Sequence, residues 1–455
     1  MISGSRLAAA FGLLISIWVG VGDPLGLGPD GAPVAGLILA AITLYATGVV
    51  AEHLTALLFF AVAMIFAVAP PSLVFSGFAT QAFWLVLSGL VIGAAIHATG
   101  LGARVARLLS RLFPQSYAGL LGGLAFVAMA ISFFMPSSMG RIVLLMPIAL
   151  ALADRYGLAE GTKARAGIAL LTGFCCFNAP NGILPATVPN MVFIGAVQDA
   201  YGFAPLYGEW LLLHFPFLGA FKALVIFAVA WLLFRGPVAP SNDTMAEEPW
   251  TGAEKRLAAI LVFALVGWAT DVVHGISPAW IGLAAAILAL LPGVGVLGRD
   301  AFKKIDAAPP IYVAGILALG ALIADSGLGA RLGAEMAAIL PLAPGQDLLN
   351  YYSLAFGGGV TSLFTTMPGL PAVMVPLAEP LREASGFQLE TMLATVVLSY
   401  STTILPYQAP PIILAMSLSG AKMGDAVKLV GCVAIVSYAV ILPLNFVWWQ
   451  ILALL

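Results

Sequence analysis

Small polar residues interrupt one of the most apolar stretches of the chain. From Ser132 to Ile148 the sequence reads SFFMPSSMGRIVLLMPI, so Ser137, Ser138 and Arg141 lie in a segment hydrophobic enough to enter a membrane. An arginine at the centre of a bilayer costs about 2.5–3.5 kcal/mol, which favours a functional site or a specific charge partner. We predict a re-entrant helical hairpin whose half-helix ends meet a ligand. The alternative is a Pro-kinked helix whose arginine reaches the membrane interface.

Three further interruptions carry the same kinds of side chain. The sequence reads NAPNGILPATVPN over 178–190, TTMPG over 365–369 and ILPYQAPP over 404–411. Half-helix N-termini expose N–H groups that suit an anion, whereas unwound carbonyls with Ser, Thr and Asn oxygens suit a hard cation such as sodium. We therefore predict broken helices at 178–190 and 404–411 and a second hairpin tip at 365–369, all lining one site.

The candidate side chains form two sets according to the ligand that they would bind. Candidates for the anion are Ser137, Ser138, Arg141, Asn190, Thr366, Thr403 and Gln408. Candidates for sodium, if sodium is used, are Ser137, Asn178, Asn181, Thr187, Thr365 and Thr402. Tyr407 is a further candidate in the second half. A single hydroxyl is more often a helix cap or a packing contact, but a set gathered at four breaks indicates a site.

The charged side chains inside the apolar segments leave several interpretations open. Arg141 could bind a carboxylate or sulfate with two parallel hydrogen bonds. It could instead replace the charge of a sodium ion, which would make a carrier proton-coupled or an exchanger, or it could pair with Asp154 or extend to the cytoplasmic surface. Lys222 is expected to extend to the interface, and His97, within a predicted span, could relay protons.

The composition restricts the class of protein. The chain has 455 residues, of which 61% are hydrophobic and 9% charged, and its mean hydropathy is +1.05. These values indicate an all-α polytopic membrane protein, and the net charge of −2 argues against a nucleic-acid partner. Cys175, Cys176 and Cys432 show no metal-ligand spacing and are expected to be packed residues. No catalytic pair or metal motif is apparent, so neither an enzyme nor a resident cofactor is expected.

The hydrophobic segments predict about 11 transmembrane helices and two re-entrant hairpins. The segment from Gly236 to Lys255 is the one substantial polar stretch and divides the chain into halves. We expect scaffold helices in 1–112 and 257–340, a cytoplasmic linker in 236–256, and transport elements (hairpin, broken helix and last span) in 113–235 and 341–455.

The two halves contain nearly the same short sequence motif. TGLGAR occupies 99–104 and SGLGAR occupies 326–331, and in each half a hairpin and then an ILP break follow. A cytoplasmic N-terminus places most of the 19 lysines and arginines on the cytoplasmic side. In that orientation the first hairpin enters from inside and the second from outside, so the repeats are inverted.

Amphipathic segments precede both hairpins. Arg104, Arg107 and Arg111 fall three to four residues apart in Gly100–Leu112, which places them on one helical face. We predict that this segment and Gly327–Leu340 lie along the membrane interface.

Nearly the whole chain resembles the divalent-anion/sodium symporters of the ion transporter superfamily, which carry dicarboxylates, citrate and sulfate. Residues 54–112 and 301–332 resemble equivalent segments of its two halves. LPATVPN resembles the family's broken-helix motif Gly-Thr-Pro-Pro-Asn, with Thr187, Pro189 and Asn190 matching. The resemblance implies a homodimer with a fixed scaffold domain and a transport domain that moves like an elevator.

The chain departs from this family at its most functional motifs. The family's hairpin tips carry Ser-Asn-Thr motifs that bind the substrate carboxylate and help to hold sodium. Here the tips read Ser137-Ser138-Met139 and Thr366-Met367-Pro368, and Arg141 stands where a second Thr is common. In the second broken helix, Ala409-Pro410-Pro411-Ile412 replaces the usual Thr and Asn.

Together, these features predict a secondary active transporter that moves a small anion, a di- or tricarboxylate or sulfate, by an elevator mechanism coupled to sodium or protons. The alternative is an exporter or exchanger of arsenite or an organic acid that does not use sodium. Its partners would be the anion, the lipid bilayer and a second copy of the chain. Its location would be a bacterial inner membrane, with the N-terminus in the cytoplasm.

Overall fold

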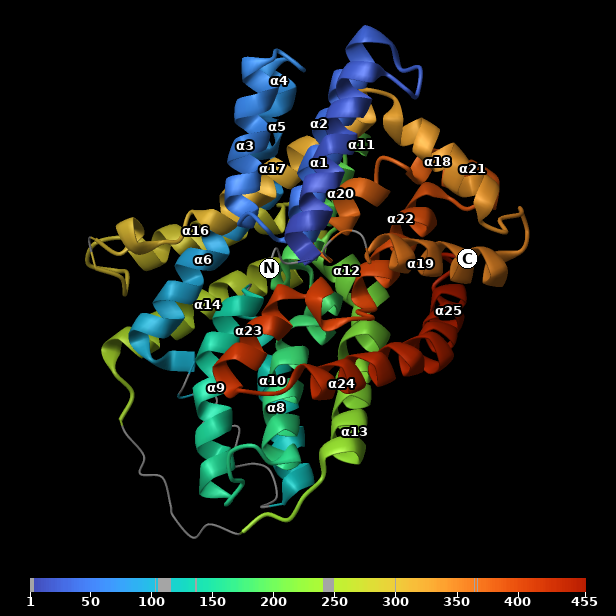
Figure 1. Ribbon diagram of the computed structural model, residues 1–455. Coiled ribbons are helices and arrows are strands. Elements are labelled where there is room, and N and C mark those ends of the chain that lie inside the picture. The colour runs from blue at the N-terminus through green and yellow to red at the C-terminus, as the bar shows by residue number, and fades with distance from the viewer. Residues whose placement is uncertain are drawn as a thin grey trace.

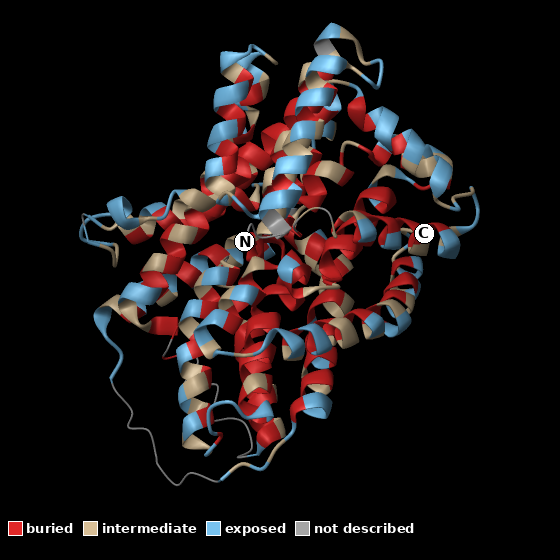
Figure 2. Ribbon diagram, viewed as in Figure 1, coloured by how far each residue is buried: buried red, intermediate tan, exposed pale blue. Residues whose placement is uncertain are grey.

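Helices account for most of the part of the chain that the computed structural model describes, and no strand occurs in it. That part comprises residues 4–102, 104, 116–135, 137–239, 249–298, 300–363, 365 and 367–455. The prediction of an all-α fold is therefore confirmed for the described residues. Figure 1 shows the helices, and Figure 2 shows that the most deeply buried ones, α10 among them, occupy the centre.

The first half begins with flanking helices and ends with interrupted ones. A helical hairpin is followed by a helix that unwinds twice and by a long helix with a π-helical turn. The flanking elements are α1 (Gly4–Gly22), α2 (Gly28–Thr47), α3 (Glu52–Ile65), α4 (Pro71–Val74), α5 (Ser76–Ala79) and α6 (Gln81–Thr99). The interrupted ones are α8 (Tyr117–Ser132), α9 (Ser138–Arg155), α10 (Lys163–Phe177), η1 (Ala179–Gly182), η2 (Leu184–Ala186), α11 (Val188–Tyr201), α12 (Tyr207–His214), the π-helix η3 (Phe215–Phe221) and α13 (Lys222–Phe234).

The second half repeats this order of elements. Its flanking elements are α14 (Gly252–Ala269), α15 (Asp271–His274), α16 (Pro278–Leu290), η4 (Phe302–Lys304), α17 (Ala308–Asp325) and α18 (Leu328–Ile339). Its interrupted elements are α19 (Asp347–Thr361), α20 (Leu370–Met374), α21 (Ala378–Ser385), α22 (Leu389–Ser401), η5 (Pro406–Gln408), α23 (Pro410–Ser419), α24 (Met423–Val436), the π-helix η6 (Ser437–Ile441) and α25 (Leu442–Ile451).

Prolines explain where the broken helices unwind. A proline inside a helix removes a backbone hydrogen bond and clashes with the preceding turn, but it is tolerated in a first turn. Pro180 and Pro185 follow the end of α10, and Pro189 lies in the first turn of α11. In the second half, Pro406 follows α22 and Pro410 starts α23. Both breaks thus lie where the sequence placed them.

The two hairpin tips are turns between consecutive helices. The first turn joins α8 to α9, which run side by side in Figure 1, and the second joins α19 to α20. Figure 1 places α8 and α9 of the first hairpin at the bottom of the molecule, whereas α19 and α20 of the second are drawn above them. This placement suits inverted repeats, but re-entry into a membrane stays a prediction.

Four helical stretches of at least 18 residues in the described residues are apolar enough to cross a membrane. They are α6, α17, Tyr207–Phe234, which joins α12 to α13, and Met423–Ile451, which joins α24 to α25. Seven shorter apolar helices accompany them. This observation does not decide whether the predicted number of about 11 spans is correct, because that number also counted apolar helices shorter than 18 residues.

The first amphipathic segment differs from its prediction at Arg104. This side chain is buried rather than part of a solvated face, and its Nε donates to Glu254 Oε1 over 2.6 Å. Arg107 and Arg111 lie outside the described residues. The second amphipathic segment is the helix α18. Through this bond Arg104 joins the first half to the first turn of α14. Glu254 also accepts from the backbone N–H of Thr251 there.

Candidate functional site

The two broken helices meet each other at their unwound segments. Asn178 Nδ2 donates to the Thr403 hydroxyl over 2.9 Å, and the Tyr400 hydroxyl donates to Asn190 Oδ1 over 3.0 Å. All four residues are buried, although they are more than 200 positions apart in sequence. The predicted convergence of the two breaks is therefore present in the structure.

Side chains of the first break satisfy its own backbone. Asn190 Nδ2 donates to the carbonyls of Asn181 and Ile183 over 3.1 and 2.9 Å. The Thr187 hydroxyl donates to Asn181 Oδ1 over 2.8 Å. From α12, Trp210 Nε1 donates to the same Asn181 carbonyl over 3.1 Å. A buried carbonyl without a partner is costly, so these side chains stabilise the unwound segment.

Gln408 plays the same part in the second break. Its Oε1 accepts from the N–H groups of Ile404 and Leu405 over 2.8 and 2.7 Å. Its Nε2 donates to the Ser362 hydroxyl over 2.6 Å, and its carbonyl accepts from the Met367 N–H over 3.0 Å. Gln408 therefore fastens the second hairpin tip to the second break.

Two other candidates of the second half donate to backbone carbonyls. The Thr402 hydroxyl donates to the Leu398 carbonyl over 3.2 Å, within the last turns of α22. The Tyr407 hydroxyl donates to the Leu363 carbonyl over 2.9 Å and adds a second link between tip and break.

Arg141 fastens the first tip to the first break. Its side chain is fully buried, and Nη2 donates to the carbonyls of Cys176 and Ala186 over 2.6 and 2.9 Å. Nη1 donates to the Met135 carbonyl in the tip, and Nη2 also reaches the Ser138 hydroxyl over 3.2 Å. The alternative pairing with Asp154 is wrong, because that carboxylate accepts from Arg165. The alternative of an arginine at the surface is also excluded.

The expectation that Lys222 extends to the interface is wrong. Its side chain is fully buried, and Nζ donates to the carbonyl of Ser401, the last residue of α22. The π-helix η3 precedes Lys222 and packs closely on the first break: a Cβ on Gly182 would lie 2.9 Å from Gly219 N. This packing places the start of α13 against the breaks and brings the ammonium to the second one.

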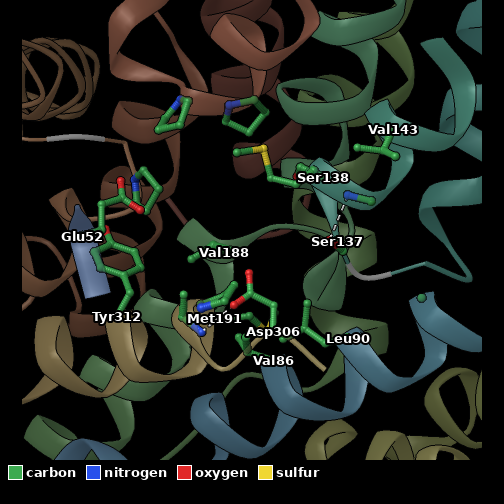
Figure 3. Close-up of a pocket in the computed structure, with 18 of the residues that line it drawn as sticks. Glu52, Val86, Leu90, Ser137, Ser138, Val143, Val188, Met191, Asp306 and Tyr312 are labelled. Carbon is green, nitrogen blue, oxygen red and sulfur yellow. Dashed lines mark hydrogen bonds between the residues drawn. The ribbon is translucent and has the colours of Figure 1, made fainter. Parts of the chain in front are cut away.

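A cavity of about 630 Å³ lies between the tips, the breaks and the flanking helices (Figure 3). Ser137 and Ser138 of the first tip line one side in Figure 3, and Glu52 and Tyr312 lie on the other. Its remaining wall is mainly apolar, from α6, α9, α11 and α17, with prolines of the second tip and break. The volume is within the range of small-ligand pockets.

Three helix N-termini lie at this cavity. The Ser137 hydroxyl caps α9 by accepting from the Gly140 N–H over 3.1 Å, and both residues line the cavity. Val188 opens α11 and Pro410 opens α23, and both line the same space. Three N-termini thus meet at the cavity, and the partial positive charge at each attracts anions.

The structure divides the predicted residues between this cavity and the core behind it. Ser137 and Ser138 line the cavity. Thr366 lies outside the described residues, and Thr365 is half-buried, with a hydroxyl 3.4 Å from the Thr361 carbonyl. The other candidates are buried and not part of its lining: Arg141, Asn178, Asn181, Thr187, Asn190, Thr402, Thr403 and Gln408.

Several polar residues of the lining were not predicted as site residues. Glu52, His53 and Asp306 face the cavity from the flanking helices or the loop before α17, as does His97, which the sequence had suggested only as a proton relay. Glu52 and His53 do interrupt an apolar run in the sequence, which was the available signal. Among the described residues, no group of three or more His, Cys, Asp or Glu side chains could hold a metal ion.

Comparison with known proteins places the chain among transporters. It matches the family model described as the transmembrane region of sodium:sulfate symporters over residues 5–455. A membrane protein of Cupriavidus necator is 24% identical over 388 residues, which are 82% of this chain and 76% of that protein. The L-tartrate/succinate antiporter of Escherichia coli K12 is 26% identical over 209 residues. That match covers 42% of each protein, so it spans less than half of the antiporter.

A solved structure shares the fold. The YdaH transporter of Alcanivorax borkumensis, whose structure was described as revealing an unusual topology, aligns with a TM-score of 0.57 at 15% identity. The alignment covers 93% of this chain and 99% of that one. At this identity the likeness concerns the fold alone.

Proposed function

The chain belongs to the sodium:sulfate symporter family, and on that premise we propose that its cavity carries a di- or tricarboxylate or sulfate across the membrane. As a member of this family it is a multi-pass membrane transporter and not an enzyme. The observation that carries the proposal is the meeting of three helix N-termini at a cavity of about 630 Å³. The partial positive charge at such ends attracts carboxylate or sulfate oxygens. The first two residues of α23 are prolines without an N–H group, so the direct donors come from the first turns of α9 and α11.

The anion would contact Ser137, Ser138 and the first turns of α9, α11 and α23. Asn190, Thr403, Gln408 and Arg141 would act from behind by holding these turns in place. The sodium candidates already hydrogen-bond within the protein, Thr187 to Asn181 and Asn178 to Thr403. Asn178 donates through Nδ2, so its Oδ1 is buried without a hydrogen-bond partner, and the proposal includes coupling to sodium, coupling to protons, and exchange.

Alternating access would come from movement of the hairpins and broken helices, as a transport domain, against the flanking helices, as a scaffold. Glycines lie at this boundary: a Cβ on Gly195 of α11 would approach Leu317 of α17 to 2.7 Å, and one on Gly320 of α17 would approach the Ala372 carbonyl of α20 to 2.9 Å. Small residues let the backbones of neighbouring helices approach each other closely. A homodimer in a bacterial inner membrane, with a cytoplasmic N-terminus, completes the proposal.

Thermal unfolding of the purified protein against a panel of anions tests the function. A ligand at 100 times its dissociation constant stabilises the native state by about 2.7 kcal/mol, which is readily measured. Stabilisation by succinate, tartrate, citrate or sulfate is the expected result. Stabilisation by arsenite or by a monocarboxylate alone would favour the exporter. If no anion raises the melting temperature, with or without sodium, the proposed substrate class is wrong.

A further inference from the structure

A second cavity, which we call the apolar groove, lies beside the first hairpin and shares no lining residue with the anion cavity. Its volume is about 660 Å³, and its walls are α8, η3, the first turns of α13 and Leu265 of α14. Every described residue of its lining is apolar. Phe126 and Leu224 of this lining have 50% and 56% of their surfaces exposed, so the groove is open on one side.

The open side of the apolar groove faces the hydrocarbon of the membrane. The helical stretch Tyr207–Phe234, which ends with α13, is long and apolar enough to cross a bilayer, and α8 is one of the shorter apolar helices. Water needs polar partners to occupy a cavity, and the side chains of this groove supply none. An acyl chain gains dispersion contacts with such walls. The groove therefore suits the acyl chain of a lipid.

One face of α13 continues the groove towards the membrane surface. Its residues follow each other at intervals of three to four: Ala220, Leu224, Phe227, Trp231 and Arg235. The first three line the groove, and the guanidinium of Arg235 lies over the Trp231 ring at 5.9 Å from its centre. The rise from Leu224 to Arg235 is about 16 Å, close to half of the hydrocarbon core, about 15 Å. Arg235 is exposed and thus lies at headgroup depth when Leu224 lies near the midplane.

We propose that the apolar groove is a phospholipid site, with an acyl chain in the groove and an anionic headgroup at Arg235. Apolar walls, then a tryptophan, then a cation follow the order of acyl chain, interface and phosphate in a phospholipid. A basic side chain at the surface favours anionic lipids such as phosphatidylglycerol. The site does not depend on which anion the transporter carries.

The deep end of this site reaches the first hairpin tip. Phe133 and Phe134 line the groove, and the next residue, Met135, lines the anion cavity. The ring of Phe133 also contacts that of Phe215 in η3, with 5.4 Å between their centres. A bound acyl chain therefore packs against the side of the first tip that faces away from the anion.

Native mass spectrometry of the purified, delipidated protein tests the proposal. Phosphatidylglycerol and phosphatidylethanolamine with the same acyl chains are titrated separately. We expect about fivefold higher affinity for phosphatidylglycerol, the effect of one cation near a headgroup. Arg235→Gln should abolish this preference, whereas Arg331→Gln, an exposed arginine on α18, should keep it. Equal affinities for the two lipids, or a preference that persists in Arg235→Gln, would overturn the proposal.

Filling the groove gives a second test. Gly122 lines it, and an added Cβ there meets only the Phe227 ring at 3.6 Å, an ordinary contact. Gly122→Leu should lower the affinity for both lipids about tenfold, the equivalent of about two displaced methylene groups. Gly431→Leu is the control, because nothing lies within 4 Å of its added Cβ. Equal affinities in these two variants would overturn the proposal. A shift of Gly122→Leu from dimer to monomer with unchanged lipid binding would assign the groove to a second copy of the chain instead.

Photocrosslinking of the unmodified protein decides the question even if Gly122→Leu does not fold. The protein is reconstituted with phosphatidylglycerol that carries a diazirine at the end of one acyl chain, and crosslinked peptides are identified. We expect crosslinks to concentrate in 122–134 and 215–227. Equal labelling of the surface around Ile435 in α24, which is 69% exposed but lies outside the groove, would overturn the proposal.

Discussion

Asn190 shows how single residues make an unwound helix possible in an apolar interior. Its amide satisfies two carbonyls of the first break and accepts from Tyr400 of the second broken helix. Gln408 likewise hydrogen-bonds the backbone of the second break, and Arg141 links the first tip to the backbone of the first break. Each polar residue is paired with backbone that a regular helix would have paired with itself.

Asn190→Leu keeps a similar volume and removes these bonds. The carbonyls of Asn181 and Ile183 lose their amide donor, and each unsatisfied buried group costs about 1–3 kcal/mol. The Asn181 carbonyl still accepts from Trp210, so we expect the loss of unfolding free energy to lie at the lower end of the range for two unsatisfied groups. Thermal unfolding in detergent measures the loss. The control is Gln388→Leu, an exposed amide before α22, and equal melting temperatures for both variants would contradict this role for Asn190.

Gly140→Ala tests the contribution of the first hairpin tip to anion binding. An added Cβ would lie 2.7 Å from Met135 Cε, so that methyl group must move, and 3.2 Å from Ser137 Oγ, which crowds the cap of α9. We expect anion affinity to fall about 2- to 10-fold, the equivalent of about one hydrogen bond. Gly431→Ala in α24 is the control, because nothing lies within 4 Å of its added Cβ. The idea fails if calorimetry gives both variants the affinity of the unmodified protein.

The residues of the site were only partly predictable. Small polar residues beside prolines in apolar sequence identified the breaks, because local chemistry determines where a helix must unwind. The same pattern did not separate side chains that face the cavity, such as Ser138, from those that hold the backbone, such as Asn190. That distinction depends on contacts between segments more than 200 residues apart, such as Tyr400 with Asn190, which no local pattern contains.

At the scale of elements, the two halves share one sequence of parts: a hairpin, a broken helix and a long helix with a π-helical turn. Sequence repeats predicted the first two parts. The π-helices η3 and η6 were not predicted, since their cause is packing: η3 lies against the first break, where Gly182 contacts Gly219. The expectation that Lys222 extends to the interface was wrong for the same reason, because the position of η3 determines where the Lys222 side chain points.

The ion pair between Arg104 and Glu254 connects the elements of the two halves. Hydrogen bonding from Arg104 lowers the pKa of the Glu254 carboxyl to about 2. A lowered pKa in the folded state stabilises the protein above the ordinary carboxyl pKa, and this contribution disappears as the pH falls through the lowered value.

Glu254→Gln should therefore lower the melting temperature at pH 7. The difference from the unmodified protein should shrink below about pH 4.5 and vanish near pH 2. Glu390→Gln, an exposed carboxylate in the first turn of α22, provides the control. A difference that is constant from pH 7 to pH 3 would show that the ion pair does not stabilise the fold.

At the scale of the whole molecule, the cavity belongs to both halves and to the flanking helices at once. The sequence indicated a transporter through its hydropathy, repeats and family resemblance. It did not show that Glu52 and Asp306 line the same cavity as the first tip, because the cavity forms only when α3, α6 and α17 pack against the broken helices.

Protection of a cysteine inside the cavity tests whether this space holds the anion. Cys175 and Cys176 are buried, so Cys432→Ser gives a background without an accessible thiol among the described residues. Val143 lines the cavity and Val294 lies in an exposed loop, with 47% and 53% of their surfaces exposed. Maleimide labelling of Val143→Cys is then compared with that of Val294→Cys.

We expect succinate at ten times its dissociation constant to slow labelling of Val143→Cys about tenfold and to leave Val294→Cys unchanged. Unslowed labelling of Val143→Cys, under conditions where succinate raises the melting temperature, would place the anion elsewhere and contradict the proposed site.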